Sequence, residues 1–227
     1  MAKPVGAHSW VQRILCAALV ACVLANAAAA AAAWHRYQLL LAAPPQSTTY
    51  STDALMRAEM WFDNVMGWRN AMLVASILLL VAWLDRMRGL ADGIWPEGQR
   101  RSRAWLIFGW GLPVANLFVP KMFLNDLWAA GRPGHRRGHP LLMLWWVSIL
   151  VAFGSSGTML RVRNGAHAAQ AIDQMQQVMV CDALFAIAAC LTLAVIRRLS
   201  SMLEHAARSA PLPSARPQGV QGSLAAM

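Results

Sequence analysis

Four runs of apolar residues, separated by shorter polar segments, set the pattern of this chain. They cover residues 14–33, 66–84, 141–160 and 178–196. A helix rises 1.5 Å per residue, so about 20 apolar residues cross the ~30 Å hydrocarbon core of a bilayer. The pattern therefore predicts an all-α membrane protein with four transmembrane helices, over about residues 12–33, 66–84, 141–160 and 178–196.

A fifth apolar stretch lies between the second and third runs, over residues 104–128, and Pro113 and Pro120 interrupt it. From Trp105 to Val119 there are only fifteen residues before Pro120, which is too short for a span. Each proline removes a backbone donor and leaves carbonyl groups without a hydrogen bond. Within a bilayer, such carbonyl groups occur only where other groups of the protein or water bind them. Asn116, Asn125 and Asp126 are the nearby side chains suited to that task.

This stretch is therefore predicted to form a helical hairpin that enters and leaves on the same side. One interpretation is a re-entrant hairpin that lines a site at the inner face. The other is a pair of short amphipathic helices in the headgroup region, anchored by Trp105, Trp110 and Trp128.

Composition agrees with a membrane location. The chain has 227 residues, of which 58% are hydrophobic and 13% charged, whereas soluble domains carry about 25% charged residues. No hydrophilic segment is long enough for a second domain. We expect one membrane domain over residues 1–200. A disordered cytoplasmic tail is expected over residues 201–227, where proline, serine and glycine accumulate after Ala210.

The first apolar run has two interpretations. A basic start and Ala-x-Ala sites before residue 33 are typical of a cleaved signal peptide. A retained helix is favoured, with Trp10 and Trp34 as interfacial anchors at its ends. Trp83 is expected to be a further belt residue, at the end of the second run. The helix that contains this second run is expected to begin at Asp53, whose acid suits a helix N-terminus.

The distribution of positive charge predicts orientation. Fifteen Lys and Arg residues lie in the N-terminus, the 85–139 loop and the tail, against five in residues 34–69 and 161–177. The positive-inside rule then places both termini in the cytoplasm of a multi-pass plasma membrane protein. The net charge of +10 sits at the ends of apolar runs, which favours contact with the bilayer and anionic headgroups over nucleic acid.

Asp182 and Arg69 are the charged residues that lie within apolar runs, at similar depth near the predicted outer face. A buried acid in a membrane helix is a candidate for ion or proton coupling. A structural ion pair between the two residues, or an Asp182 close enough to the surface to remain hydrated, is favoured over coupling, because either avoids an isolated buried charge.

A motif in the hairpin reads GW-x-x-P-x-x-NL-x-x-P followed by D-x-W. It consists of Gly109, Trp110, Pro113, Asn116, Leu117, Pro120, Asp126 and Trp128. This motif resembles the signature of a bacterial membrane family, the domain of unknown function 4328. The resemblance covers about residues 10 to 200, and it implies a four-helix membrane domain and supplies no activity.

No catalytic or cofactor constellation is recognisable. The four cysteines lie in apolar segments without C-x-x-C spacing, so they are expected to be small buried hydrophobes. His135 and His139 have no third ligand partner. The pattern predicts a protein that is not an enzyme and binds no cofactor or metal. A structural, scaffolding or regulatory role is favoured, with a membrane protein or a second copy as partner. The alternative is a small transporter or channel-like protein whose inner gate is the Pro/Asn hairpin.

Overall fold

The fold is a bundle of long antiparallel helices, seen in a computed structural model that describes residues 9–42, 53–100, 102, 104–105, 118–132, 134, 137–162 and 168–209. Four long helices form the bundle: α1 (Ser9–Ala42), α2 (Asp53–Ile94), α6 (Pro140–Val162) and α7 (Ala168–Ser209). Two short ones accompany them, the 3-10 helix η2 (Pro96–Gly98) and α5 (Val119–Ala130). The described residues form helices and no strands, which confirms the predicted all-α class.

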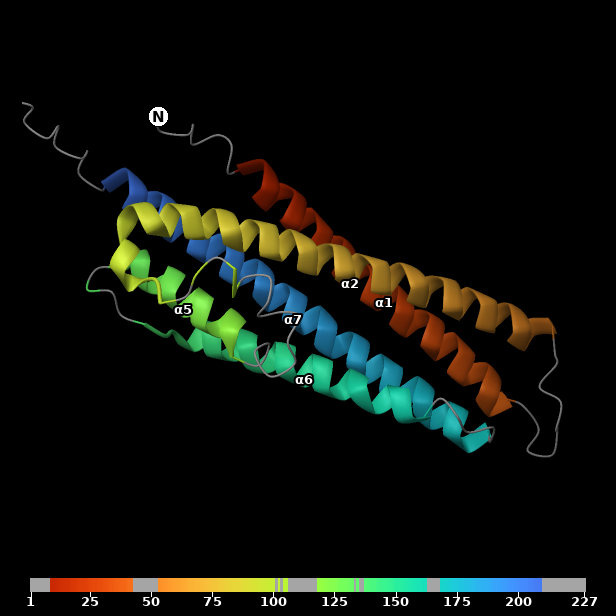
Figure 1. Ribbon diagram of the computed structural model, residues 1–227. Coiled ribbons are helices and arrows are strands. Elements are labelled where there is room, and N and C mark those ends of the chain that lie inside the picture. The colour runs from red at the N-terminus through yellow and green to blue at the C-terminus, as the bar shows by residue number, and fades with distance from the viewer. Residues whose placement is uncertain are drawn as a thin grey trace, which may run out of the picture.

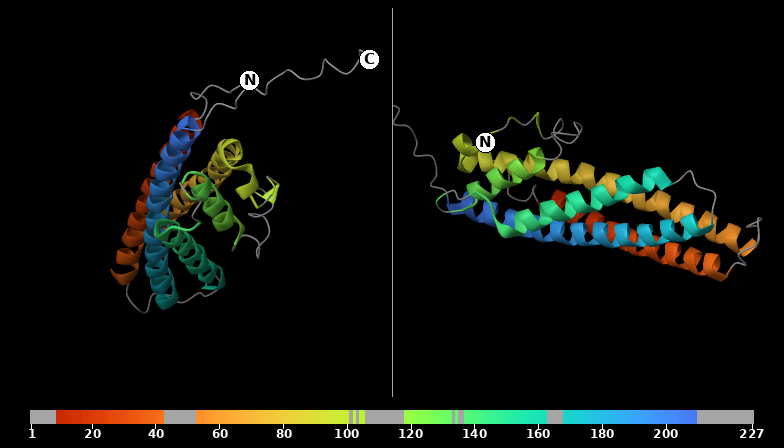
Figure 2. Two further views of the ribbon diagram at one scale, coloured as in Figure 1. Left: turned by 90° about the vertical axis from the view of Figure 1, so that its left-hand side faces the viewer. Right: turned by 90° about the horizontal axis from the view of Figure 1, so that it is seen from below.

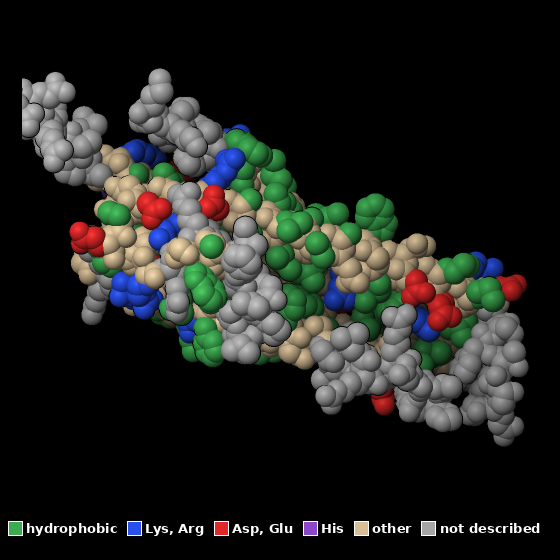
Figure 3. Space-filling view, viewed as in Figure 1, with side chains coloured by type: hydrophobic (Ala, Val, Ile, Leu, Met, Phe, Trp, Pro, Cys, Tyr) green, Lys and Arg blue, Asp and Glu red, His purple; other side chains and the backbone are tan. Residues whose placement is uncertain are grey.

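Different helix termini form the two ends of the bundle (Figure 1). One end holds the start of α1, the end of α2, α5, the start of α6 and the end of α7, and we call it the basic end. The far end holds the end of α1, the start of α2, the end of α6 and the start of α7. Figure 2 shows in both views that α5 lies against the other helices at the basic end. On the face drawn in Figure 3, most charged side chains gather toward the two ends, with mainly hydrophobic side chains between them.

Three helices are long and apolar enough to cross a membrane: Trp10–Ala42, Asp53–Ile94 and Ala171–Ser209. This indicates a membrane protein. The described apolar part of α6, Pro140–Ser156, is shorter. Because α2 and α7 each have 42 residues, they measure about 63 Å at the helical rise. They are therefore about twice as long as the hydrocarbon core and continue beyond it.

The helices extend further than the apolar runs predict. α2 begins at Asp53 as expected, but it continues past residue 84 to Ile94 because Met87 and Ala91 keep its core-facing stripe buried. The predicted polar connection at 161–177 is largely helical, since α6 ends at Val162 and α7 begins at Ala168.

The prediction of a disordered tail from residue 201 is wrong for its first nine residues. α7 runs to Ser209. Ile196, Leu199 and Leu203 lie three and four positions apart on one helix face, and each has 0% exposure. Leu203 lies against Gly131, where an added Cβ would come within 3.5 Å of it. Packing against the end of α5 therefore holds this part of α7 helical. Residues 210–227 lie outside the described part of the chain.

α5 is a buried helix of the basic end. Pro120 lies in its first turn, where a missing backbone N–H is no loss, so this proline starts a helix instead of breaking one. Most of its residues are buried, including Phe123, Leu124 and Trp128, and it contacts α2, α6 and α7. A helix lying in the headgroup region would expose one polar face, and α5 does not. Residues 106–117 of the predicted hairpin lie outside the described residues.

Two tryptophans expected at the surface are in the core instead. Trp83 is 1% exposed and Trp128 0% exposed, so the interpretation of both as interfacial anchors is wrong. Trp10 and Trp34 are each 52% exposed, as anchors must be, and the Arg86 guanidinium lies 4.6 Å from the Trp10 ring centre. Hydropathy alone does not distinguish a tryptophan that faces the helix bundle from one that faces lipid headgroups.

Candidate functional site

Asp126 is the centre of a charged cluster at the basic end. It lies on α5 and is 1% exposed. Arg100 donates to it through Nε at 3.0 Å, and its NH2 group lies 2.9 Å from Oδ1. The Nε atom of Arg137 lies 3.3 Å from the same oxygen. One buried carboxylate thus holds two arginines from segments 26 residues before it and 11 residues after it in the chain.

The two arginines tie further groups to this cluster. The Arg137 NH2 group donates to the Gly98 carbonyl at 3.2 Å, and its guanidinium lies 5.5 Å from the centre of the Trp95 ring. Arg100 and Arg137 are 43% and 42% exposed. A charge-assisted hydrogen bond is stronger than a neutral one. The cluster therefore fixes η2 and the approach to α6 against α5, and it leaves a positive outer surface.

His139 and Trp128 form a second contact at this end. Their ring centroids are 4.6 Å apart, and the Arg132 guanidinium lies 5.5 Å from the Trp128 ring centre. Nδ1 of His139 accepts a hydrogen bond from the Leu141 backbone N–H at 3.1 Å, so this histidine caps the first turn of α6. The pKa of His139 is lowered, first by desolvation and then by the positive charges of Arg132 and Arg198. Both effects favour the neutral imidazole.

Arg69 and Asp182 meet inside the bundle. Their Nε and Oδ1 atoms are 3.3 Å apart, and the two side chains are 6% and 0% exposed. Neither carboxylate oxygen of Asp182 accepts a hydrogen bond within the described residues. The Arg69 guanidinium also lies 5.5 Å from the Phe185 ring centre and donates to the Met66 sulfur at 3.4 Å. The structure thus brings together the two charged residues that the sequence places at similar depth.

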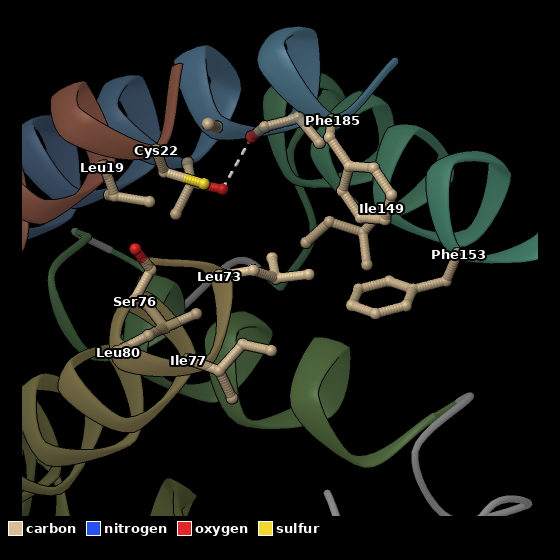
Figure 4. A pocket seen from close by; sticks show the side chains of 12 residues that line it. Leu19, Cys22, Leu73, Ser76, Ile77, Leu80, Ile149, Phe153 and Phe185 are labelled. Carbon is tan, nitrogen blue, oxygen red and sulfur yellow. Dashed lines mark hydrogen bonds between the residues drawn. The ribbon is translucent and has the colours of Figure 1, made fainter. Parts of the chain in front are cut away.

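A small cavity lies between α1, α2, α6 and α7, closer to the middle of the bundle (Figure 4). It has about 60 Å³ of room for the centres of water molecules, and one water needs about 10–15 Å³. Its lining is mostly apolar, but Cys22, Ser76 and Thr192 contribute polar atoms. The Ser76 hydroxyl is buried and has no hydrogen-bond partner in the described residues.

Thr192 connects α6 and α7 beside this cavity. Its hydroxyl accepts a hydrogen bond from the Trp145 indole N–H at 2.9 Å and donates one to the Ala188 carbonyl at 2.7 Å, which is the dashed line in Figure 4. Asn26 is a second buried polar residue, 2% exposed, and its amide donates to the Cys22 carbonyl at 2.7 Å. Polar atoms in the bundle core are thus used to join helices or to satisfy their own helix.

Among the residues that the structure describes, no three His, Cys, Asp or Glu side chains lie close enough to hold a metal ion. The cysteines divide into two kinds. Cys22 and Cys181 are buried as expected, whereas Cys16 is partly exposed and Cys190 exposed.

The sequence model of the domain of unknown function DUF4328 matches residues 46–201. The chain belongs to this family. The DUF4328 match therefore begins before α2 and ends within α7, so that it includes the Asp126 cluster and the Arg69–Asp182 pair. No curated protein and no solved structure matches the chain.

The DUF4328 motif is only partly within the described residues. Three of its members, Pro120, Asp126 and Trp128, lie on α5, where they start the helix, bind the two arginines and pack against His139. The other five, Gly109, Trp110, Pro113, Asn116 and Leu117, lie outside the described residues. Asn125, which was predicted to satisfy freed carbonyls, is partly buried, and its Oδ1 has no hydrogen-bond partner in the described part of the chain.

Sequence reasoning missed the two partners of Asp126. In the sequence, Arg100 and Arg137 are two of the many cations of the 85–139 loop, and nothing local marks them as partners of Asp126. The signal that points to them is a lone acid, Asp126, between two basic clusters: a carboxylate in an apolar helix needs a cation, and each cluster offers arginines.

Proposed function

We propose that this DUF4328 protein is a structural, scaffolding or regulatory component of the bacterial plasma membrane and that it is not an enzyme. The proposal rests on one observation: both of the buried carboxylates that the structure describes are paired with arginine. Asp126 and Asp182 each pair with arginine from another segment. Such pairs fix the arrangement of helices and leave neither acid available as a general acid or base.

The proposed topology has four spans, with both termini and the basic end in the cytoplasm. α6 has 23 residues and measures about 35 Å, which exceeds the ~30 Å core. The positions of the described arginines support this orientation. Arg86, Arg132 and Arg197 all lie at the basic end. Cytoplasmic segments carry an excess of Lys and Arg.

The proposed partners are the bilayer, anionic headgroups and a membrane protein or a second copy of this chain. Nucleic acid is not among them, because the basic side chains follow directly on apolar helices and so lie at headgroup depth. Among the described cations toward the far end, Arg57 is exposed, whereas Arg36 is paired with Glu59 and Arg69 is buried. We therefore place the contact with a partner protein at the basic end.

Cross-linking in native membranes, followed by purification and quantification of bound proteins, tests this role. The proposal predicts a specific partner in fixed stoichiometry. Arg198→Gln at the basic end should lower its recovery, and Arg57→Gln should not, because this matched charge change lies at the far end. The absence of any stoichiometric partner, together with solute flux in liposomes, would refute the scaffold.

A small transporter or channel-like protein is the second candidate, and the cavity of Figure 4 favours it. The cavity has room for water, and the buried Ser76 hydroxyl has no partner among the described residues. The inner gate of this candidate was predicted at Asn116 and its flanking prolines. Ser76→Val should lower the flux of a transporter and leave partner recovery by a scaffold unchanged.

A further inference from the structure

A second, larger pocket lies between the start of α1 and the end of α7. It has a volume of about 480 Å³ and is lined by Gln12, Arg13, Cys16, Arg197 and Glu204 together with two serines of α7. Small-molecule sites typically measure about 300–1,000 Å³. The two helix ends that form it lie side by side at the basic end (Figure 2, left). None of its residues belongs to the Asp126 cluster.

The charge of this pocket favours an anion. Arg13 and Arg197 approach it from different helices and are exposed, and neither has an ion pair within the described part of the chain. The one acid in the lining, Glu204, is already paired with Arg208 at 3.5 Å. Two unpaired guanidinium groups on neighbouring helices match a phosphate.

The position of the pocket indicates that the phosphate belongs to a lipid. Trp10 is half-exposed, carries the Arg86 guanidinium on its ring, and lies one turn before Arg13. Tryptophan and arginine together mark headgroup depth. The pocket therefore opens where lipid phosphates lie, provided that α1 crosses the membrane as proposed above.

Apolar side chains continue from the pocket along both helices. On α1, Cys16, Val20 and Leu24 follow Arg13 at intervals of three and four residues and share one stripe, on which Val20 and Leu24 are 47% and 65% exposed. On α7, Ala194, Cys190 and Ile187 precede Arg197 at intervals of three and four residues and are exposed, Ile187 by 53%. These stripes offer acyl chains a surface directly beneath the charged pocket.

We propose that this pocket binds the headgroup phosphate of one anionic phospholipid, with Arg13 and Arg197 as the two contacts to the phosphate. The inference rests on the membrane placement in the proposed function. It goes beyond general attraction of a basic surface, because it assigns the contact to two of the many arginines at this end. Basic pockets between membrane helices on the cytoplasmic side bind anionic headgroups in this way.

Cys16 provides a reporter inside the pocket. The protein with Cys190→Ala retains Cys16 as its accessible thiol, since Cys22 and Cys181 are buried. It is reconstituted into nanodiscs of phosphatidylcholine alone or of phosphatidylcholine and phosphatidylglycerol in equal parts. The labelling rate of Cys16 by a neutral maleimide is then measured. Native mass spectrometry of the same protein counts the phosphatidylglycerol molecules that stay bound.

The matched variants are Arg197→Gln and Arg198→Gln, which remove the same charge from adjacent positions, only one of which lines the pocket. Phosphatidylglycerol should slow the labelling of Cys16. Arg197→Gln should weaken this protection at least about tenfold, the factor that corresponds to a charge-assisted hydrogen bond to phosphate of about 1.5 kcal/mol. Arg198→Gln should leave protection and bound lipid nearly unchanged.

Equal weakening by both variants would overturn the site, because it would show a diffuse surface charge only. Protection by inorganic phosphate in phosphatidylcholine nanodiscs would overturn the lipid as its source and indicate a soluble phosphate ligand. Labelling that ignores lipid composition would overturn the site altogether. Partner cross-linking does not depend on this pocket. A negative result here therefore does not contradict the scaffold role, which the cross-linking experiment tests separately.

Discussion

Replacing Asp182 by alanine tests the interior ion pair most sharply. The substitution leaves the Arg69 guanidinium, which is 6% exposed, without its counter-charge inside the bundle. Removing one partner of a buried pair typically costs about 3–5 kcal/mol. The Arg69 cation keeps its contacts to the Phe185 ring and the Met66 sulfur. We therefore expect a loss near the lower limit, about 3 kcal/mol in the free energy of unfolding.

The assay is unfolding by sodium dodecyl sulfate in mixed micelles, followed by tryptophan fluorescence, for the unmodified protein and four variants. Asp182→Ala and Arg69→Ala are each expected to destabilise strongly. The double variant removes both charges, so it should recover about 2 kcal/mol relative to the sum of the single losses. Asp173→Ala is the matched control, because this acid also lies on α7 but is exposed. It should change the stability by no more than about 0.5 kcal/mol.

Additive losses in the double variant would refute the reasoning, since they would show that the two side chains do not interact. A loss for Asp182→Ala as small as that of the exposed control would also refute it. Asp182 would then be hydrated, and its burial in the bundle would be wrong.

Three further predictions concern the basic end and the helix contacts. Asp126→Ala should cost about 1–2 kcal/mol, less than a fully buried pair because Arg100 is 43% exposed, and trypsin should then cleave after Arg100 faster. Thr192→Val should cost about 1 kcal/mol in the same unfolding assay, because the buried Trp145 indole N–H loses its acceptor. The lowered pKa of His139 predicts that stability falls as the pH drops below about 6.5, since the unfolded chain takes up that proton more readily. His139→Asn should flatten this part of the pH profile, and an unchanged profile would contradict the prediction.

The class of fold follows from local properties of the sequence. Runs of about 20 apolar residues can satisfy their backbone groups in a membrane only as helices, so the helical bundle is predictable without any long-range information. The start of α2 at Asp53 is equally local. The Arg69–Asp182 contact is predictable because each charge needs a partner inside the bilayer, and the other charge is the one available at the same depth.

What the sequence did not predict depends on contacts between distant segments. Asp126 acquires Arg100 and Arg137 only because α5 folds back against α2 and the start of α6. The burial of Trp83 and Trp128 has the same origin, as does the helical extension of α7 to Ser209, which Leu203 holds against the end of α5. Hydropathy measures the preference of one side chain for lipid or protein over water, and it does not say which of the two apolar surroundings that side chain meets.

The central claim is that all segments at the basic end lie on one face of the membrane, including both sides of the stretch at residues 104–128. The most direct measurement is labelling by a membrane-impermeant maleimide of Ser102→Cys, Ser209→Cys and Ala42→Cys, each with Cys16→Ala and Cys190→Ala, in intact cells and in inverted membranes. The account predicts that Ser102→Cys and Ser209→Cys label only in inverted membranes and Ala42→Cys only in intact cells. Labelling of Ser102→Cys and Ser209→Cys from opposite faces would contradict it.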